Sequence, residues 1–161
     1  MVDSLEIKQY LKQQDIPFKT FEHPAVYTCE EAKQYTQGMK GIAGKNLFLK
    51  NKKSTKFYLV ILPPEKRLDM NRLGEHLGEK VKFANEDDLL RLLQLTAGAV
   101  SPFGLIYDKT HEVEVVIDKE VYASAFVCLH PNINTETLEL SREGFRKFLQ
   151  SLSITVKVLE A

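Results

Sequence analysis

The chain has 161 residues, 43% of them hydrophobic and 27% charged, which fits one globular domain spanning residues 1–161. Its 22 basic and 22 acidic side chains cancel, which disfavours a protein that coats nucleic acid through bulk charge. The sequence has no apolar run of about 18 residues and no signal-peptide pattern at its start. We therefore expect a cytoplasmic protein without a membrane segment, whose two cysteines, Cys29 and Cys128, are reduced thiols acting as small hydrophobic groups.

The first half of the chain is expected to hold three helices and a strand hairpin. Helical spacing of apolar residues begins at Asp3 or Ser4, and Pro17 ends it. A capping-box pattern at residues 28–31 predicts the second helix. Asp69 is the expected N-cap of the third, and Gly78 its end. The expected elements are helices over 3–14, 28–36 and 69–77 and strands over 18–22, 45–50 and 56–62.

The second half alternates short strands with helices. Asn85 and Ser141 are the expected N-caps of two helices with apolar stripes. The other expected elements are strands over 81–83, 104–107, 113–117, 125–129, 135–140 and 154–159, loops over 98–102 and 130–134, and a turn or short helix over 118–122. Because strands outnumber helices and several are joined as hairpins, we expect an α+β fold. Its single mixed, mainly antiparallel sheet would be surrounded by helices.

The familiar sequence signatures of catalysis and of cofactor binding are missing. The chain has no glycine-rich phosphate loop and no nucleophile elbow. Its four histidines, at positions 23, 76, 111 and 130, do not have the spacing of zinc ligands. We therefore expect neither a metal nor a cofactor, and any activity must use less distinctive groups.

Lys45 and Asn46 form the first segment that points to chemistry. They lie where a glycine-containing segment enters an apolar strand. A lysine held there with partial desolvation can bind a phosphate or polarise an ester carbonyl. The plain alternative is a lysine at a strand end that points into water, and spacing alone favours that alternative.

A second segment, Gly98-Ala99-Val100-Ser101-Pro102, can turn sharply at its glycine and is fixed at its proline. Its backbone N–H groups are suited to binding a carbonyl oxygen. The alternative is an ordinary turn before a strand.

A third segment carries His130, Asn134 and Thr135 directly after an apolar strand. Its imidazole, amide and hydroxyl groups can bind a ribose, an amine or a water molecule. The alternative is a turn in which Asn and Thr side chains satisfy the backbone.

Basic residues are concentrated between Lys40 and Lys56, a stretch without an acid. Its hairpin lysines, Lys50, Lys52, Lys53 and Lys56, are candidate contacts for nucleic-acid phosphates. A solvated lysine hairpin is the alternative, and charge alone favours it.

Four segments in order resemble the prolyl-tRNA editing domain superfamily, and the resemblance covers nearly the whole chain. They are HPAVYT from His23, KNLFL from Lys45, the Gly98–Pro102 loop with FGLI, and HPNINTET from His130. The resemblance implies an α+β domain that hydrolyses the ester between an amino acid and the terminal adenosine of a mischarged tRNA. The chain departs from the pattern at residues 41–44, where relatives often carry a histidine and a threonine, and at Ala97, where many carry proline.

The resemblance also implies roles for individual residues. Lys45 inherits the position most closely tied to activity, Asn46 is its matching neighbour, and His130 lies at the pocket wall. The Gly98–Pro102 loop would hold the aminoacyl carbonyl, while water attacks with help from the substrate's own ribose hydroxyl. The pattern looks more like the alanine-clearing branch, so the expected substrate is alanyl-tRNA(Pro).

Other functions remain open from the sequence. The same fold can clear cysteine or serine, and related domains can bind aminoacyl-tRNA or a synthetase without catalysis. A generic metabolite-binding domain is a third possibility. The expected partners are the acceptor end of mischarged tRNA(Pro) and prolyl-tRNA synthetase, and the expected state is a monomer.

Overall fold

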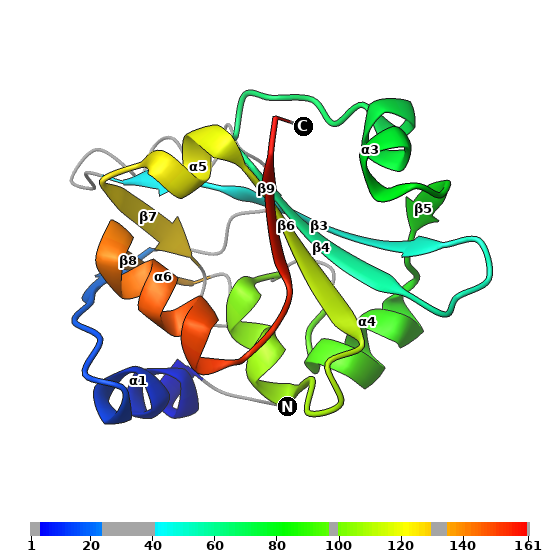
Figure 1. Ribbon diagram of the computed structural model, residues 1–161. Coiled ribbons are helices and arrows are strands. Elements are labelled where there is room, and N and C mark those ends of the chain that lie inside the picture. The colour runs from blue at the N-terminus through cyan, green and yellow to red at the C-terminus, as the bar shows by residue number, and fades with distance from the viewer. Residues whose placement is uncertain (1–3, 24–40, 97–99, 130–134, 161) are drawn as a thin grey trace.

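The computed structural model describes residues 4–23, 41–96, 100–129 and 135–160. Within them the chain forms two β-sheets with helices packed around them (Figure 1). The α+β class with mixed sheets is confirmed, although the strands divide into two sheets where one was expected.

The larger sheet has five strands in the order β5-β3-β4-β6-β9. They are β5 (Val81–Phe83), β3 (Lys45–Asn51), β4 (Phe57–Leu62), β6 (Val113–Asp118) and β9 (Val156–Leu159). Strands β5, β3 and β4 are antiparallel, whereas β4, β6 and β9 are parallel. Strand β4, with the sequence FYLVIL, is buried at every position, as expected for a central strand covered on both faces.

The smaller sheet has four strands in the order β1-β8-β7-β2. They are β1 (Lys19–Glu22), β8 (Glu136–Ser141), β7 (Phe126–Leu129) and β2 (Ile42–Ala43). Only Gly44 separates β2 in this sheet from β3 in the larger one. The chain therefore passes from one sheet to the other directly beside Lys45.

The helices begin where polar side chains cap them. Asp69, Asn85 and Ser141 each accept backbone N–H groups of the following turn, as predicted. Gly78 adopts φ 77°, the left-handed conformation that ends a helix at low cost in glycine. The helices are α1 (Ser4–Gln13), α3 (Met70–Leu77), α4 (Glu86–Leu93), α5 (Lys119–Ala123) and α6 (Arg142–Ser151).

Two apolar clusters hold the described elements together. The larger one joins one face of the five-stranded sheet to β7, β8, α1, α4 and α6, with side chains such as Phe48, Phe103 and Phe148. The smaller one lies on the opposite face of that sheet, where α3 contributes Leu73 to a cluster that includes Leu49. The five-stranded sheet is therefore covered on both faces.

One predicted strand was wrong. Residues 104–107 belong to a 3₁₀-helix, η2 (Pro102–Tyr107), instead of a strand. Pro102 occupies the start of this helix, and the Ser101 hydroxyl caps it by accepting the N–H of Phe103 at 3.2 Å. The apolar run was misread because a buried short helix and a buried strand give the same pattern. The helix expected over 28–36 and the loop over 130–134 lie outside the described residues.

Candidate active site

Lys45 lies at the first position of β3, on the face covered by α3. Strand alternation puts it on the same side as Leu47 and Leu49, which belong to the smaller apolar cluster. Its ammonium donates a hydrogen bond to the backbone carbonyl of Lys66 at 2.5 Å. Lys45 is therefore held by the segment that joins β4 to α3.

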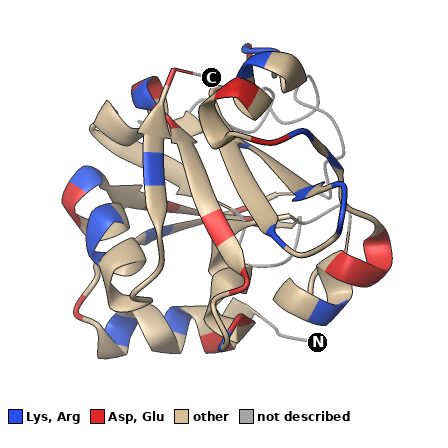
Figure 2. Cartoon of the chain, turned by 45° about the vertical axis from the view of Figure 1, so that its right-hand side comes forward, with Lys and Arg blue, Asp and Glu red and all other residues tan. Residues whose placement is uncertain are grey.

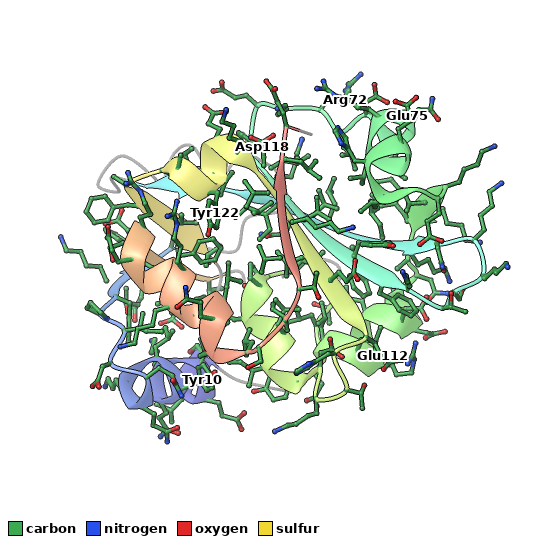
Figure 3. All side chains as sticks on the ribbon, in the orientation of Figure 1. Tyr10, Arg72, Glu75, Glu112, Asp118 and Tyr122 are labelled. Atoms are coloured by element: carbon green, nitrogen blue, oxygen red, sulfur yellow. The ribbon has the colours of Figure 1, made fainter. Side chains whose placement is uncertain are left out.

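That segment is anchored in turn by an ion pair. The ammonium of Lys66 lies 2.7 Å from the carboxylate of Asp118, which is only 1% exposed at the end of β6. Asp118 also caps α5 by accepting the N–H of Glu120 at 2.9 Å. Figure 3 shows Asp118 where β6 passes into α5. Because β4 and β6 are parallel, their carboxyl ends meet at this edge, the usual location of ligand sites in such sheets.

A hollow of about 400 Å³ opens beside these groups. Its lining combines apolar residues with charged ones: Ile42, Pro63, Pro64, Glu65, Lys66 and Glu120. Because Lys45 donates to the carbonyl of Lys66, its ammonium lies next to this hollow. Sequence reasoning missed Lys66, Asp118 and Glu120, since no spacing reveals that β4 and β6 pair in parallel.

Asn46 points to the opposite face of β3 from Lys45. It shares that face with Phe48, and its cross-strand partner Ile61 also belongs to the larger cluster. Its amide nitrogen donates weakly to the carbonyl of Gly44, at 3.5 Å, while its carbonyl oxygen is buried without a partner among the described residues. A buried unpaired carbonyl costs about 1–3 kcal/mol, a cost that a bound ligand can remove.

The described part of the Gly98–Pro102 loop lies on Asn46's side of the sheet. Val100 packs against the larger cluster, and Ser101 and Pro102 are buried. The hydroxyl of Ser101 is already used as the cap of η2. Gly98 and Ala99 lie outside the described residues, so the expected N–H pocket is not described.

The third segment is described only in part. His130 and Asn134 lie outside the described residues, whereas Thr135 is exposed, and its carbonyl accepts the N–H of His23 at 2.9 Å. His23 also contacts the hydroxyl of Thr137 at 2.8 Å through its imidazole Nε2. The histidine of the first family segment therefore lies beside the start of β8.

Glu136 sits next to these groups and pairs with Lys8 at 2.7 Å. Burial pushes the pKa of Glu136 upward, but hydrogen bonds from Lys8 and Ser4 outweigh it and leave this pKa below its usual value. This carboxylate is therefore negative at neutral pH.

The four hairpin lysines differ in their availability. Lys50 pairs with Asp88 at 2.9 Å, and both side chains are largely buried. Burial pushes the pKa of Asp88 upward, but Lys50, together with hydrogen bonds from Asn85 and Arg91, keeps the pKa of that carboxyl below its usual value. Lys52, Lys53 and Lys56 are exposed around the turn, which is blue in Figure 2.

Cys128 is a buried free thiol, as the sequence indicated. Burial, with the neighbouring carboxylate of Glu139, raises its pKa to about 12, so the thiol is protonated at neutral pH. Cys29 lies outside the described residues.

Residues 4–23, 41–96, 100–129 and 135–160 hold neither a cluster of metal ligands nor a membrane-spanning helix. No group of three or more His, Cys, Asp or Glu there is arranged to hold a metal ion. None of the helices described is long and apolar enough to cross a membrane.

Comparison with known proteins identifies the family. The family model described as the aminoacyl-tRNA editing domain matches residues 23–148, most of the chain. The chain belongs to the aminoacyl-tRNA editing domain family and is an editing deacylase, which confirms the resemblance drawn from the four segments.

Two relatives match over nearly their whole length. The prolyl-tRNA editing protein ProX of Acetoanaerobium sticklandii is 39% identical over 151 residues, covering 93% of this chain and 92% of that protein. The mouse prolyl-tRNA synthetase associated domain-containing protein 1 is 34% identical over 151 residues, covering 91% and 89%.

Two solved structures share the fold. The hypothetical protein APE2540 superposes with a TM-score of 0.76 at 19% identity, covering 98% of each chain. A proposed trans-editing enzyme for prolyl-tRNA synthetase superposes with a TM-score of 0.73 at 21% identity, covering 100% of this chain and 99% of that one.

Proposed function

We propose that the chain removes alanine from mischarged tRNA(Pro) by hydrolysing the aminoacyl ester. The observation that carries this proposal is the 39% identity to the prolyl-tRNA editing protein ProX, which extends across 93% of the chain. The four segments named from the sequence, including Lys45-Asn46, support it. The proposed location of this reaction is the cytoplasm, where tRNA is charged and edited.

The chemistry needs no strong protein nucleophile. Water adds to the ester carbonyl, the C–O bond to the ribose breaks, and the ribose oxygen leaves with a proton, giving alanine and free tRNA. The neighbouring ribose hydroxyl assists the water. An aminoacyl ester is already activated, so positioning and stabilisation of the oxyanion supply most of the catalysis.

The roles of the protein groups follow from this reaction. Lys45 exchanges the carbonyl of Lys66 for the terminal phosphate or ester region of the substrate, and Asn46 offers its buried carbonyl oxygen to a donor such as the α-amino group. Backbone N–H groups within the Gly98–Pro102 loop, from the residues before Pro102, stabilise the oxyanion, and His130, Asn134 and Thr135 line the pocket. Lys45 and Asn46 point to opposite faces of β3, so a substrate that contacts both must reach them around the beginning of this strand.

Size explains why alanine is the proposed amino acid. A synthetic site built for proline rejects a smaller side chain weakly, because lost apolar contact is worth only about 1–3 kcal/mol. A second pocket that admits alanine and excludes proline corrects this error. Cysteine and serine are the alternatives of similar size.

The proposed partners are mischarged tRNA(Pro) and prolyl-tRNA synthetase. The name of the mouse relative associates that protein with the synthetase. The large exposed apolar residues among those described, Leu5, Phe83, Leu90 and Val158, lie on four different elements, which favours a monomer.

Hydrolysis of four substrates tests the proposal. Alanyl-, cysteinyl-, seryl- and prolyl-tRNA(Pro) are incubated with the wild type, with Lys45→Ala and with Lys109→Ala, a control at an exposed turn. We expect fast release of alanine only, lost in Lys45→Ala and kept in the control. Preference for cysteine or serine would reassign the substrate. Absence of hydrolysis with tight tRNA binding would instead favour a non-catalytic aminoacyl-tRNA-binding protein.

A further inference from the structure

A buried carboxylate lies in the smaller sheet, outside the candidate site. Glu139 is 4% exposed and lies in β8 between Leu138 and Leu140. Both leucines belong to the larger apolar cluster, so strand alternation puts Glu139 on the opposite face of this sheet. Cys128 lies on that same face of β7, because its neighbour Leu129 also belongs to the cluster. Cys128 and Glu139 are cross-strand partners, so their side chains meet across the β7–β8 pair (Figure 1).

One carboxylate oxygen of Glu139 accepts two hydrogen bonds. Its Oε2 accepts the backbone N–H of Gly41 at 3.1 Å and the thiol of Cys128 at 3.7 Å. Gly41 comes directly before β2, so this side chain of β8 reaches past β7 to the start of β2. Hydrogen bonds to an ionised acceptor are stronger than those between neutral groups. We therefore expect Glu139 to hold the start of β2 against the sheet.

Strand β2 has few other contacts that fix its position. It consists of Ile42 and Ala43 alone, whereas strands in globular proteins usually have about 3–10 residues. It lies at the edge of the smaller sheet and, among the described strands, pairs with β7 on one side. Its position therefore depends strongly on the contacts made at its two ends.

Both ends of β2 are closely packed glycines. A Cβ at Gly41 would lie 2.8 Å from the carbonyl carbon of Phe126 and 2.9 Å from its oxygen. A Cβ at Gly44 would lie 3.2 Å from Cγ2 of Ile61 on β4. Residues 41–44 thus run in contact with both sheets and lead directly into Lys45. A displacement of Gly41 should therefore move Lys45 as well.

We propose that Glu139 is a positioning residue for the editing reaction. By holding Gly41 against β7, it fixes where the chain enters β3, and hence where Lys45 and Asn46 meet the substrate. Displacement of a reacting group by about 1 Å can lower a rate by up to about a hundredfold. Glu139 acts through the backbone of residues 41–44 and not by touching the substrate. This inference rests on the proposed function for the identity of the aminoacyl-tRNA and for the roles of Lys45 and Asn46.

Two substitutions of Glu139 separate its hydrogen bond from its packing. Glu139→Gln keeps a carbonyl oxygen that can accept the N–H of Gly41, whereas Glu139→Met has a similar size and no such oxygen. The matched controls are Asp108→Asn and Asp108→Leu. Asp108 is also 4% exposed, and its carboxylate accepts the backbone N–H groups of Glu112 and Val113. Hydrolysis of alanyl-tRNA(Pro) gives kcat and KM for each variant, and urea denaturation shows whether each variant is folded.

The expected signature is a loss in kcat that follows the hydrogen bond. In Glu139→Met, kcat should fall about tenfold while KM stays within about twofold of the wild-type value. Glu139→Gln should keep at least about half of the wild-type kcat, because its oxygen still accepts the N–H of Gly41. The Asp108 variants should lose stability without losing kcat. Equal losses of kcat in Glu139→Gln and Glu139→Met would overturn the proposal, as would a wild-type kcat in folded Glu139→Met.

Gly41→Ala tests the same path without replacing the carboxylate. Its added Cβ must push β2 away from Phe126, so kcat should fall at least as far as in Glu139→Met. Because both changes displace the same segment, the double variant should lose no more kcat than Gly41→Ala alone. A wild-type kcat in folded Gly41→Ala, or additive losses in the double variant, would contradict the proposed path.

Amide hydrogen exchange reports on this segment without any substrate. Exchange of the amides from Gly41 to Asn46 should be faster in Glu139→Met than in the wild type and Glu139→Gln, and unchanged in the Asp108 variants. If the wild type hydrolyses no aminoacyl-tRNA, the proposed function fails, and faster exchange confined to Glu139→Met still supports the role of Glu139 in holding this segment. Unchanged exchange in Glu139→Met would overturn that role even if the wild type hydrolyses alanyl-tRNA(Pro).

Discussion

Lys66 and Asp118 form a 2.7 Å ion pair that fixes the backbone segment whose carbonyl holds Lys45. The two residues lie 52 positions apart in sequence and meet because β4 and β6 are parallel neighbours. The pair is unequal, since 32% of the Lys66 side chain is exposed but only 2% of that of Asp118. Its loss should therefore affect both stability and catalysis.

Replacement of Lys66 by methionine should destabilise the protein. The buried carboxylate of Asp118 would lose its cation, which costs roughly 2–3 kcal/mol. Lys66→Arg keeps the charge and should cost less. Urea denaturation at pH 7 measures both. If Lys66→Met were as stable as Lys66→Arg, the ion pair would contribute nothing beyond side-chain packing.

The same variants test whether the segment positions Lys45. Lys45 contacts the backbone of residue 66, so Lys66→Met leaves the acceptor in place but loosens the segment that carries it. We expect kcat for alanyl-tRNA(Pro) to fall by about 3- to 10-fold with little change in KM, because misplacement of a reacting group lowers the rate. An unchanged kcat in a folded Lys66→Met protein would contradict this role.

Asn46→Leu should separate stability from activity. The carbonyl oxygen of Asn46 is buried without a described partner, so an apolar side chain of similar volume removes a cost of about 1–3 kcal/mol. The variant should unfold at an equal or higher temperature while its hydrolysis falls at least tenfold, a typical cost of losing a buried substrate contact. Thermal unfolding and deacylation are measured on the same preparation. A marked drop in melting temperature would mean that the asparagine stabilises the fold.

Gly104→Ala should be more damaging than Gly78→Ala. A Cβ at Gly104 would lie 2.7 Å from Leu95 and 3.0 Å from both the Cβ and the carbonyl of Leu93, so overpacking costs about 2–3 kcal/mol. A Cβ at Gly78 would have no atom within 4 Å, so alanine there would be strained only by the φ of 77° that it must adopt. That strain costs about 1 kcal/mol. The free energies of unfolding of the two variants decide between these mechanisms, and the reverse order would refute the packing argument.

Glu79 makes stability depend on pH in a defined direction. Hydrogen bonds from Tyr58 and Asn51 lower its pKa below the ordinary value of 4.5. An acid with a depressed folded pKa stabilises the protein above its unfolded pKa, and that contribution disappears as pH falls through the folded pKa. The stability difference between the wild type and Glu79→Gln should therefore be largest at pH 6–7 and shrink below about pH 4. Denaturation at several pH values measures it, and a constant difference would contradict the pKa shift.

Local signals in the sequence predicted most elements. Asp69, Asn85 and Ser141 were recognised as caps because their chemistry acts over three residues. The hairpin that ends in Lys52 and Lys53 followed from two apolar strands and a polar turn. The strand expected over 104–107 failed for the same local reason, since Pro102 and the Ser101 cap favour a helical turn that apolar periodicity does not reveal.

The arrangement of the site depends on the pairing of strands that are far apart in the sequence, and local sequence patterns do not predict which strands pair. Lys45 was singled out from its position at a strand entrance, and the comparisons confirm the family. The contacts of Lys45 with the 63–68 segment, and of that segment with Asp118, require the parallel pairing of β4 and β6. The pairing of Lys50 with Asp88 likewise depends on how α4 packs beside β3.

The single residue between β2 and β3 couples the candidate site to the relative orientation of the two sheets. With only Gly44 between the two sheets, a tilt of one sheet relative to the other must displace Lys45 and Asn46. A substrate that binds both of these residues should in turn limit the tilt of one sheet relative to the other. Binding at the site should therefore stabilise both sheets. Amide hydrogen exchange should slow in both of them when a non-hydrolysable aminoacyl-tRNA analogue binds.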